Sequence, residues 1–345
     1  MNNYDFYRTD LVDESEEMVR HRTAAEKNTL QETDGVTFEE SRDGRVVLTS
    51  VTVDAQGEKR IGKKAGAYVT LTVPTLTTED HDGLAELSRV LIKELEEMLR
   101  EVPTVKQGKI LFVGLGNRDV TPDAVGPYAM DHLQQIVPDY YAEEGSEVFV
   151  YAPGVTIQTG LETANFVKAV TTEIQPDVLI VIDALAARNS TRLCRTIQLT
   201  NTGIHPGSGV GNNRKEISRE ALGVPVIAIG IPTVVDGPVF IADAIDTMFG
   251  YIASKIGEKD SPSSSLSVTP WLHNENKDAD RSTLLPIFGD WSTWPHEDRV
   301  QLFEEVLTNH DLRTFISPKE IDSWVALYAE TLSASLASWV ENMKK

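Results

Sequence analysis

The chain has 345 residues, of which 41% are hydrophobic and 25% charged, values typical of a soluble globular protein with a sizeable core. Acidic side chains outnumber basic ones by 53 to 32, and the resulting formal net charge of −21 repels nucleic-acid phosphates and anionic membrane surfaces. A single cysteine, no secretory leader and no apolar run near the roughly 20 residues that span a bilayer predict a cytoplasmic protein without direct nucleic-acid or membrane partners.

The N-terminal part is expected to start as a mobile arm and to continue into strands. Residues 1–35 are highly charged and weakly periodic. Residues 46–53 and 67–73 show the alternation of apolar and polar residues that is typical of strands. Residues 79–101 then predict a helix, because leucines recur at helical spacing at Leu84, Leu87, Leu91, Leu95 and Leu99.

Beyond residue 108, short apolar runs alternate with helical patterns. The strand-like runs cover 109–113, 147–151, 178–182, 196–199 and 224–229. Helical patterns fall at about 125–136, 161–174, 215–222 and 238–256. This alternation predicts an α/β fold with a mostly parallel, twisted sheet and helices on both faces, to which the N-terminal β segment and C-terminal helices are added. In such sheets ligands bind beyond the carboxyl ends of the strands.

The composition also predicts how the chain is divided. We expect a main α/β domain at 36–256, and a polar, Ser-rich linker or irregular segment at 257–295. Two helices at 296–345 are expected to pack on the main domain. The second of these helices follows Ser317 and Pro318, which are typical of a helix start.

The first cluster of interest, residues 114–127, directly follows a strand. Gly114 and Gly116 permit a tight turn and close backbone approach. The cluster lacks the third glycine of a dinucleotide-binding loop and the GK[ST] of a P-loop, so phosphate binding is disfavoured. Asp123 is expected to begin the next helix, and on the residues alone a helix N-cap is its simpler explanation.

Asp183 makes a stronger chemical candidate. It ends the most apolar run of the chain, where burying a carboxylate costs several kcal/mol unless the group is paired or bound. A functional carboxylate is therefore favoured, with an ion pair to Arg188 as the structural alternative.

Two further strand-end candidates are His205 and Asp236. His205 lies in a glycine-rich segment, 202–216, that suits an active-site loop, and it could be a general base, a metal ligand or a substrate contact. Asp236 is explained equally well as the N-cap of the following helix. No GxSxG or HExxH motif is present, and nothing marks Cys194 as activated, so two aspartates are the strongest chemical pair.

Four runs carry a resemblance to a known family: GLGNRDVTPDAVGP, VIDALAARNSTR, NTGIHPGSGVGNNRKEIS and LGVPVIAIGIPTVVD. Together they resemble the germination protease of endospore-forming bacteria, from about Arg8 to the C-terminal helices. The resemblance implies an atypical aspartic endopeptidase that degrades small acid-soluble spore proteins in the germinating spore. It also implies a homotetramer and a location in the forespore or spore core.

The same resemblance assigns residues. The family's two essential aspartates fall on Asp123 and Asp183. The fold looks similar to that of the hydrogenase maturation proteases, which bind a metal ion at these two positions. His205 is the nearest candidate for their third ligand, and Asn117 and Asp236 are expected to support the site.

The resemblance further implies a zymogen that removes its own N-terminal segment. The family motif that precedes the cut resembles Arg8-Thr9-Asp10. We therefore predict cleavage between Asp10 and Leu11, which makes residues 1–10 a short propeptide and 11–35 the arm of the mature enzyme.

The expected mechanism uses both carboxylates. One activates water while the other, protonated, polarises the scissile carbonyl, because two adjacent carboxylates do not both ionise easily. Backbone N–H groups of the 114–117 turn or the 207–211 loop are candidates to stabilise the oxyanion. A variant with a divalent metal between Asp123 and Asp183 is the alternative cofactor hypothesis. Two other functions remain open, a metal-dependent processing protease of the hydrogenase-maturation type and a non-catalytic acidic binding paralogue.

Overall fold

A computed structural model describes residues 35–73, 80–100, 102, 109–136, 147–206, 215–257, 280–310, 312 and 314–343. The chain divides into two compact units. The first comprises Met1–Ala187, Thr191–Val234 and Ser317–Lys345, and the second comprises Arg188–Ser190 and Val235–Ile316. The predicted propeptide, the Asp10–Leu11 processing site and the arm up to residue 34 lie outside the described residues. Within the described ranges, no helix is long and apolar enough to cross a membrane.

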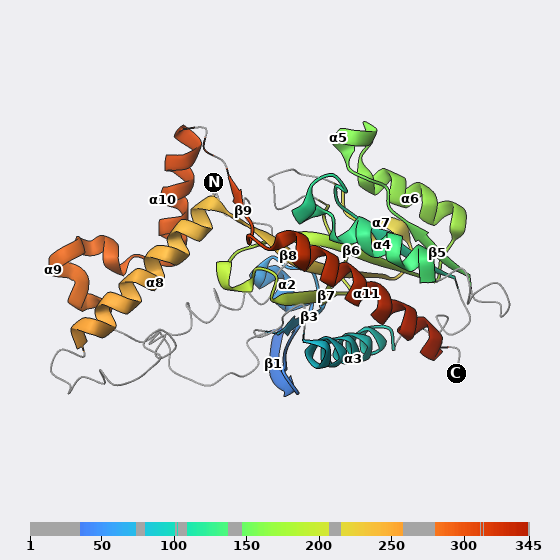
Figure 1. Cartoon of the computed structure of the whole chain (residues 1–345), viewed down its shortest axis with the longest axis horizontal. Helices are drawn as coiled ribbons and strands as arrows, with labels where there is room; N and C mark the ends of the chain where they lie inside the picture. The colour runs from blue at the N-terminus through green and yellow to red at the C-terminus, as the bar shows by residue number, and fades with distance from the viewer. Residues whose placement is uncertain are drawn as a thin grey trace. The chain divides into compact units, whose positions relative to one another are not determined.

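The described strands form a nine-stranded sheet in the order β1-β2-β3-β7-β8-β6-β4-β5, with β9 beside β8 (Figure 1). Their bounds are β1 Val36–Asp43, β2 Val46–Val53, β3 Gly66–Thr72, β4 Ile110–Gly114, β5 Val148–Tyr151, β6 Val178–Ala187, β7 Thr196–Thr200, β8 Val226–Asp236 and β9 Phe315–Ile316.

The predicted α/β class is confirmed, and the sheet is mixed. The expected parallel pairing holds where β4 lies between β5 and β6. The pairs from β1 through β2, β3 and β7 to β8, and that of β8 with β9, are antiparallel. The N-terminal β segment is therefore not a separate layer, because β3 joins β7 edge to edge and extends the main sheet.

The helices are α2 Ala55–Ile61, α3 His81–Met98, α4 Val125–Ile136, α5 Thr156–Thr159, α6 Thr163–Ile174, α7 Arg219–Leu222, α8 Gly237–Gly257, α9 Leu285–Phe288, α10 His296–Asn309 and α11 Ile321–Met343. Short 3-10 helices are η3 Thr121–Asp123, η5 Ser190–Arg192, η8 Arg281–Leu284 and η9 Gly289–Thr293. The closing helices belong to different units, α10 to the second and α11 to the first. The division into the domains expected from the sequence stays a prediction.

Helices cover both faces of the central strands, as predicted. Ile110 and Phe112 of β4 belong to the core beneath α3, α4 and α11. Leu111 and Val113 belong to the core that α6 covers on the opposite face. This alternation is possible because successive side chains of a strand point to opposite faces, and a strand buried on both sides is apolar at every position.

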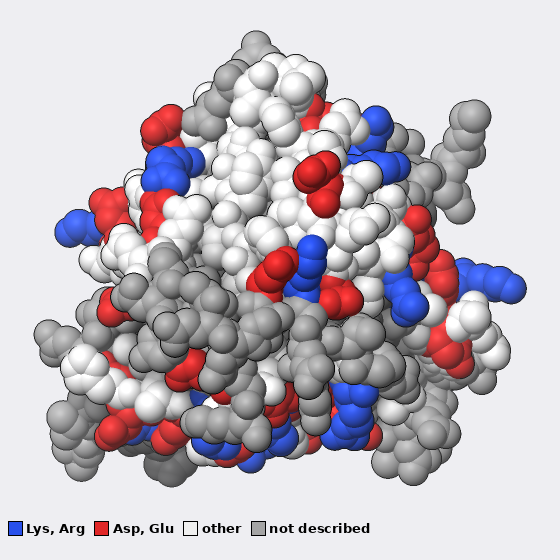
Figure 2. Space-filling view, turned by 90° about the vertical axis from the view of Figure 1, so that its right-hand side faces the viewer, with Lys and Arg blue, Asp and Glu red and all other residues white. Residues whose placement is uncertain are grey.

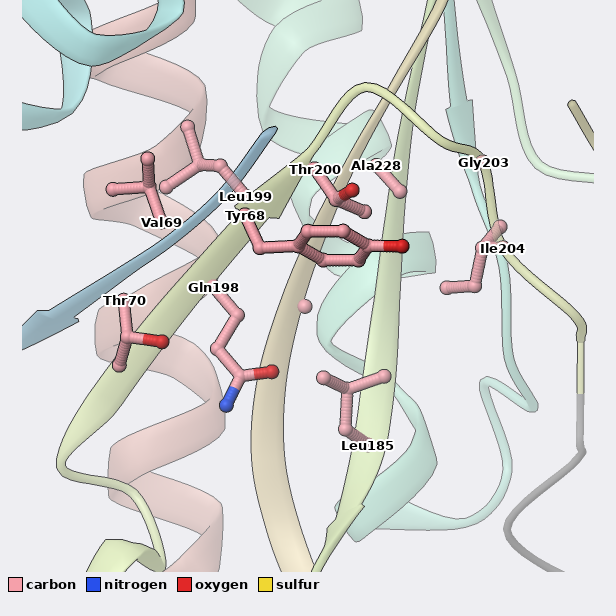
Figure 3. A pocket seen from close by; sticks show the side chains of 11 residues that line it. Tyr68, Val69, Thr70, Leu185, Gln198, Leu199, Thr200, Gly203, Ile204 and Ala228 are labelled. Atoms are coloured by element: carbon pink, nitrogen blue, oxygen red, sulfur yellow. The ribbon is translucent and has the colours of Figure 1, made fainter. Parts of the chain in front are cut away.

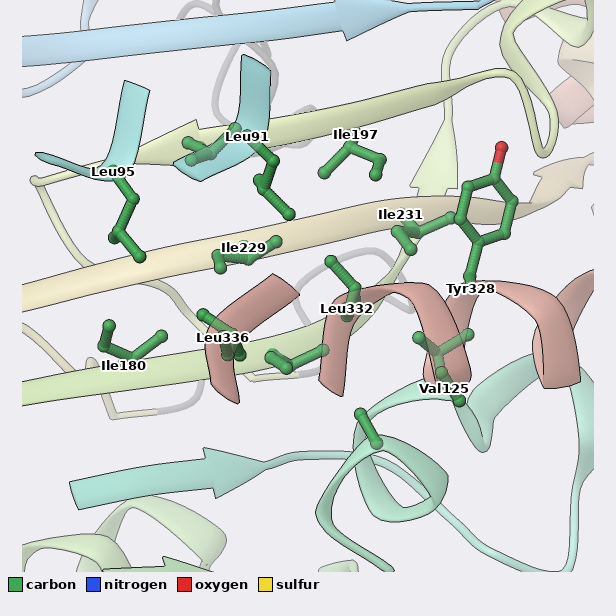
Figure 4. Packing of buried hydrophobic residues seen from close by; sticks show 14 of the residues in the cluster. Leu91, Leu95, Val125, Ile180, Ile197, Ile229, Ile231, Tyr328, Leu332 and Leu336 are labelled. Carbon is green, nitrogen blue, oxygen red and sulfur yellow. The ribbon is translucent and has the colours of Figure 1, made fainter. Parts of the chain in front are cut away.

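The larger core is built from the leucine pattern that predicts α3. Leu91 and Leu95 of α3 and Leu332 and Leu336 of α11 all reach Ile229 of β8 and its neighbours (Figure 4). All five are buried. At about 1.5–3 kcal/mol for each buried large apolar side chain, this cluster is a major contribution to the stability of the first unit.

The second unit contains a partly buried ion cluster around Asp246. Asp246 of α8 accepts a hydrogen bond of 2.6 Å from Arg281 and another from Arg299, whose side chain is fully buried. His296 Nδ1 lies 2.8 Å from Asp246 Oδ2. Buried charges are tolerated when each has partners of this kind. The segment 280–293, expected to be irregular, forms the short helices η8, α9 and η9 within this unit.

The surface carries both signs of charge despite the net charge of −21. Figure 2 shows acidic and basic side chains interspersed on the face it presents, around a broad uncharged area. Several basic groups are engaged by acidic ones, among them Arg118 with Asp131 and Arg89 with Asp43. Exposed pairs of this kind add little to stability, at about 0–1 kcal/mol each.

Candidate active site

The turn after β4 is shaped by a glycine that no other residue replaces without strain. Gly116 has φ +117°, and a Cβ at this position would lie 2.0 Å from the backbone carbonyl oxygen of Asp123. L-residues rarely adopt such a conformation. The chain therefore folds back closely enough for η3, which ends at Asp123, to sit directly over the turn.

That turn holds the Asp123 carboxylate. Asp123 Oδ2 accepts a 2.8 Å hydrogen bond from the backbone N–H of Asn117. The Asn117 side chain in turn accepts a 3.0 Å hydrogen bond from the Asp119 backbone N–H. The Asn117 N–H thus orients Asp123. Leu115 N–H donates to the Ile182 carbonyl at 2.8 Å, so two N–H groups of the turn that were expected to stabilise an oxyanion already have acceptors.

Asp183 lies inside β6 and not at its end. The strand continues to Ala187, because β6 keeps a neighbour in β8 after β4 has ended. The residue is only 6% exposed, and its Oδ1 accepts a 2.9 Å hydrogen bond from the Ala184 backbone N–H. A carboxylate is therefore buried one residue beyond the point where Gly114 of β4 pairs with Ile182.

The two aspartates are brought to the same corner of the first unit by a close backbone contact. A Cβ at Gly126, in the first turn of α4, would lie 2.3 Å from the Leu115 carbonyl oxygen and 2.7 Å from that of Ile182. Only a glycine permits this approach. The start of α4, the end of β4 and the middle of β6 consequently meet. Asp123 lies in η3 just before α4, and Asp183 follows Ile182 in β6.

His205 belongs to the first unit. It follows Ile204, which forms an isolated bridge with Ile217. Its Nε2 is 3.9 Å from Glu216 Oε2, and Glu216 also pairs with Lys64. Across the described part of the chain, no three His, Cys, Asp or Glu side chains are grouped so as to hold a metal ion. The expected metal variant therefore has no third His, Cys, Asp or Glu ligand among these residues, and the loop at 207–211 lies outside them.

The surroundings of the remaining candidates are described by the structure as follows. Asp236 is the last residue of β8, pairs with Phe315 of β9 and belongs to the second unit, as does Arg188. Cys194 is buried, and burial raises the pKa of its thiol to about 12. Its backbone N–H donates to the Pro232 carbonyl at 2.8 Å. A protonated, inaccessible thiol is a structural group and not a nucleophile.

Sequence reasoning missed a hollow in the same unit. It is shallow, and Tyr68, Leu185, Gln198 and Ile204 are among its lining residues (Figure 3). Polar residues recur at alternate positions along the buried strand β7, at Thr196, Gln198 and Thr200. A buried strand that is polar on one face was the available signal, since such a face usually meets a ligand or another polar surface.

Comparisons with known proteins place these residues in context. A family described as germination protease, Peptidase_A25, matches residues 12–343. A germination protease of Oceanobacillus iheyensis is 39% identical over 340 residues, covering 94% of this chain and 92% of the relative. The germination proteases of Bacillus cereus strain 03BB102 and Bacillus mycoides are 36% and 37% identical over 341 residues. Both alignments cover 95% of this chain and 92% of the relative.

Among solved structures, the chain is similar to a [NiFe] hydrogenase maturation protease, HycI, from Thermococcus kodakarensis. The sequence identity is 16% and the TM-score 0.30, over 41% of this chain and 80% of that chain. At this level the similarity supports no inference about the site.

Proposed function

Since the chain belongs to the germination protease family, a family of aspartic-type peptidases, we propose that it is the endopeptidase that starts the degradation of small acid-soluble spore proteins during germination. The observation that carries this proposal is the 39% identity to a germination protease over 94% of the chain. The matched residues, 12–343, include both Asp123 and Asp183.

The proposed chemistry divides the work between the two carboxylates. Asp183 is buried, and a second negative charge there is costly, so it holds the proton. Asp123 is less buried, so we assign it as the base. Asp123 takes a proton from water as the water oxygen attacks the peptide carbonyl carbon. Asp183 gives its proton to the carbonyl oxygen, which leaves a neutral tetrahedral diol.

Collapse of the diol completes the reaction. The C–N bond breaks as the leaving nitrogen receives the proton from Asp123. Asp183 recovers a proton from one diol hydroxyl as the carboxylic acid product forms. Both aspartates return to their starting states, and no step requires another reactant besides water. No step is assigned to a metal ion, because the described residues group no third His, Cys, Asp or Glu side chain with the two aspartates.

Self-processing between Asp10 and Leu11 remains part of the proposal. Its support is the Arg8-Thr9-Asp10 sequence and the start of the family match at residue 12, one residue after the new N-terminus. The propeptide 1–10, the arm 11–35, the 36–256 catalytic domain, a homotetramer and a location in the spore core are likewise proposed from the family. Neither the metal-dependent processing function nor the non-catalytic alternative is favoured by any observation on the described residues.

The test is incubation of the purified chain with a small acid-soluble spore protein. We expect a few discrete substrate fragments. N-terminal sequencing of the enzyme should give a sequence that begins at Leu11. An intact substrate after prolonged incubation with processed enzyme contradicts the proposed function. A new N-terminus elsewhere contradicts only the processing site.

A further inference from the structure

The exposed apolar side chains of this protein are concentrated in its second unit. Of the eleven large apolar residues that are exposed in the described part of the chain, nine lie between Val235 and Ile316. Scattered apolar residues are normal on a protein surface, but a concentration of them in one small unit indicates an interaction site. Helix α8, the long helix at the left of Figure 1, carries three of the nine.

Helix α8 is apolar on two opposite faces, and among the described residues only one of these faces is covered. Its inner face, centred on Phe249 and Ala253, packs against residues of η8, α9 and η9. Its exposed residues are Phe240, Ala244, Thr247, Met248, Tyr251 and Lys255. We call these six residues the exposed stripe, because they fall within about 100° of the helix circumference. A helix that is apolar all round is normally buried all round.

The exposed stripe has no acidic side chain, although the chain has a net charge of −21. The two aspartates of α8 are engaged within the second unit. Asp243 Oδ2 accepts a 2.7 Å hydrogen bond from the Ser190 backbone N–H, and Asp246 is bound by Arg281. The Thr247 hydroxyl donates to the Asp243 carbonyl oxygen at 2.9 Å, so it needs no partner outside the helix. Two copies of this acidic chain can therefore meet along the stripe with little charge repulsion.

The spacing of the exposed stripe is the same from either end. The mirrored pairs are Thr247 with Met248, Ala244 with Tyr251, and Phe240 with Lys255. When two copies of a helix cross antiparallel about a twofold axis at the centre of the stripe, each residue meets its mirror residue in the other copy. The large Tyr251 ring then meets the small Ala244, and the Lys255 ammonium meets the Phe240 ring in a cation–π contact. A surface that is complementary to itself in this way fits a second copy of the same chain.

Gly250, on the flank of the exposed stripe, is a second sign of a partner outside the chain. A glycine in the interior of a helix costs about 0.5–1 kcal/mol relative to alanine. No atom of the described residues lies within 4 Å of the position that a Cβ would take at Gly250. Packing within the chain therefore does not explain this glycine, whereas the close approach of a second helix does.

We propose that the exposed stripe of α8 is a subunit interface, at which α8 of a second copy packs antiparallel across a twofold axis between Thr247 and Met248. A strongly charged partner is not favoured, because Lys255 is the one charged residue of the stripe. The inference does not depend on the proposed peptidase activity. It identifies one of the contacts that the proposed homotetramer requires, since a tetramer with twofold symmetry uses more than one isologous interface.

The first test places charges across the twofold axis. Ala244→Glu sets a carboxylate against the Tyr251 ring of the other copy, and it should weaken association about 100-fold, because the buried charge has no partner. The mass measured by sedimentation equilibrium should then fall to half. In Ala244→Glu/Tyr251→Lys each glutamate meets a lysine of the other copy, so the wild-type mass should return at low salt. Leu161→Glu, at an exposed apolar residue of the first unit, is the control and should keep the wild-type mass.

The outcomes separate the interface from the enzyme. A monomeric wild type, or a wild-type mass for Ala244→Glu, overturns the inference. If the double variant has the wild-type thermal midpoint but stays dissociated, the mirrored pairing is wrong. An assembled wild type that cleaves no spore protein contradicts the proposed function and leaves the interface standing, whereas a monomer that cleaves it does the reverse.

The second test locates the twofold axis. The natural cysteine, Cys194, is buried, so the thiol introduced by Thr247→Cys is the accessible one. Under mild oxidation this variant should form a disulfide-linked dimer on a non-reducing gel, because Thr247 lies beside the axis and meets the same region of the second copy. Thr308→Cys, exposed on α10 of the same unit, is the matched control and should stay unlinked. Equal linking in both variants, or none in Thr247→Cys, contradicts the proposed crossing.

Discussion

The Asp123 carboxylate and the Asn117 backbone are joined by a hydrogen bond in which the Asn117 N–H donates to Asp123 Oδ2 at 2.8 Å. The bond closes a turn whose geometry depends on the left-handed backbone of Gly116. A residue that on sequence grounds passes for a helix cap is thereby held by the loop before the helix. This is the position expected of a carboxylate that must keep one orientation while it exchanges a proton.

The Gly116 turn gives the first prediction. In Gly116→Ala the new Cβ meets the Asp123 carbonyl oxygen at 2.0 Å and the backbone is strained at φ +117°. We expect a loss of about 1–3 kcal/mol in the free energy of unfolding and a fall in kcat/KM of about 100-fold, because Asp123 is displaced. Urea unfolding and cleavage of the spore protein measure the two effects.

Gly62 provides the matched control. It also has positive φ, +70°, at the C-cap of α2, but no atom of the described residues lies within 4 Å of the position that a Cβ would take. Gly62→Ala should therefore lose some stability through backbone strain and keep full activity. Equal losses of activity in both variants would contradict the role assigned to the Gly116 turn.

The second prediction concerns Cys194. Since burial raises its thiol pKa to about 12, the folded protein should not react with iodoacetamide at pH 8 and should keep full activity after exposure to it. Modification should appear only after unfolding in guanidinium chloride, as followed by mass spectrometry. Inactivation that parallels alkylation of the native protein would contradict a purely structural cysteine.

The third prediction is a pH dependence of the second unit. Burial lowers the pKa of His296, but its hydrogen bond with Asp246 and the charge of Asp243 outweigh this and raise it above its ordinary value of 6.5. The stabilisation that protonated His296 gives to the folded second unit is therefore complete below pH 6.5, and it is lost as pH rises through the raised pKa. The temperature at which the second unit, with α8 and α10, unfolds should decline over this alkaline range in the wild-type protein.

Asp246, the partner of His296, determines how the stability of the second unit changes at acid pH. Burial opposes the charge of Asp246, but hydrogen bonds from His296 and Arg281 and the charge of Arg299 lower its pKa below 3.8. Its stabilisation is present above pH 3.8 and is lost as pH falls through the lowered pKa. His296→Gln should flatten the alkaline decline, whereas His310→Gln, exposed at the end of α10, should leave it intact. An alkaline decline that survives His296→Gln would assign it to another group.

Much of the fold follows from local pattern. The alternation at 46–53 gives β2 with the predicted bounds, and the leucine spacing gives α3. The apolar run before Asp183 gives the buried strand, although its end is misplaced, because β6 is prolonged by a neighbour that lies far away in sequence. The pairing of β3 with β7 is of the same kind, since it joins residues that are distant in sequence through backbone groups alone.

A residue of the candidate site could be predicted from the sequence where it is unusual among its sequence neighbours. Asp183 is a carboxylate in an apolar run, so burial cost alone points to it. Asp123 required the family resemblance, because its role depends on a turn conformation. Gln198 and Tyr68 lie on neighbouring strands of the sheet, and the alternating polar residues of β7 were the only local signal of the hollow that they share.

The most direct test of the two-aspartate account is the rate of spore-protein cleavage by Asp123→Asn and Asp183→Asn, measured beside wild-type enzyme with matched thermal midpoints. Each substitution keeps the shape of the side chain and removes its ability to exchange a proton. We predict that each lowers kcat by about 1000-fold or more. Cleavage at the wild-type rate by either variant would contradict the assignment of Asp123 and Asp183 as the catalytic pair.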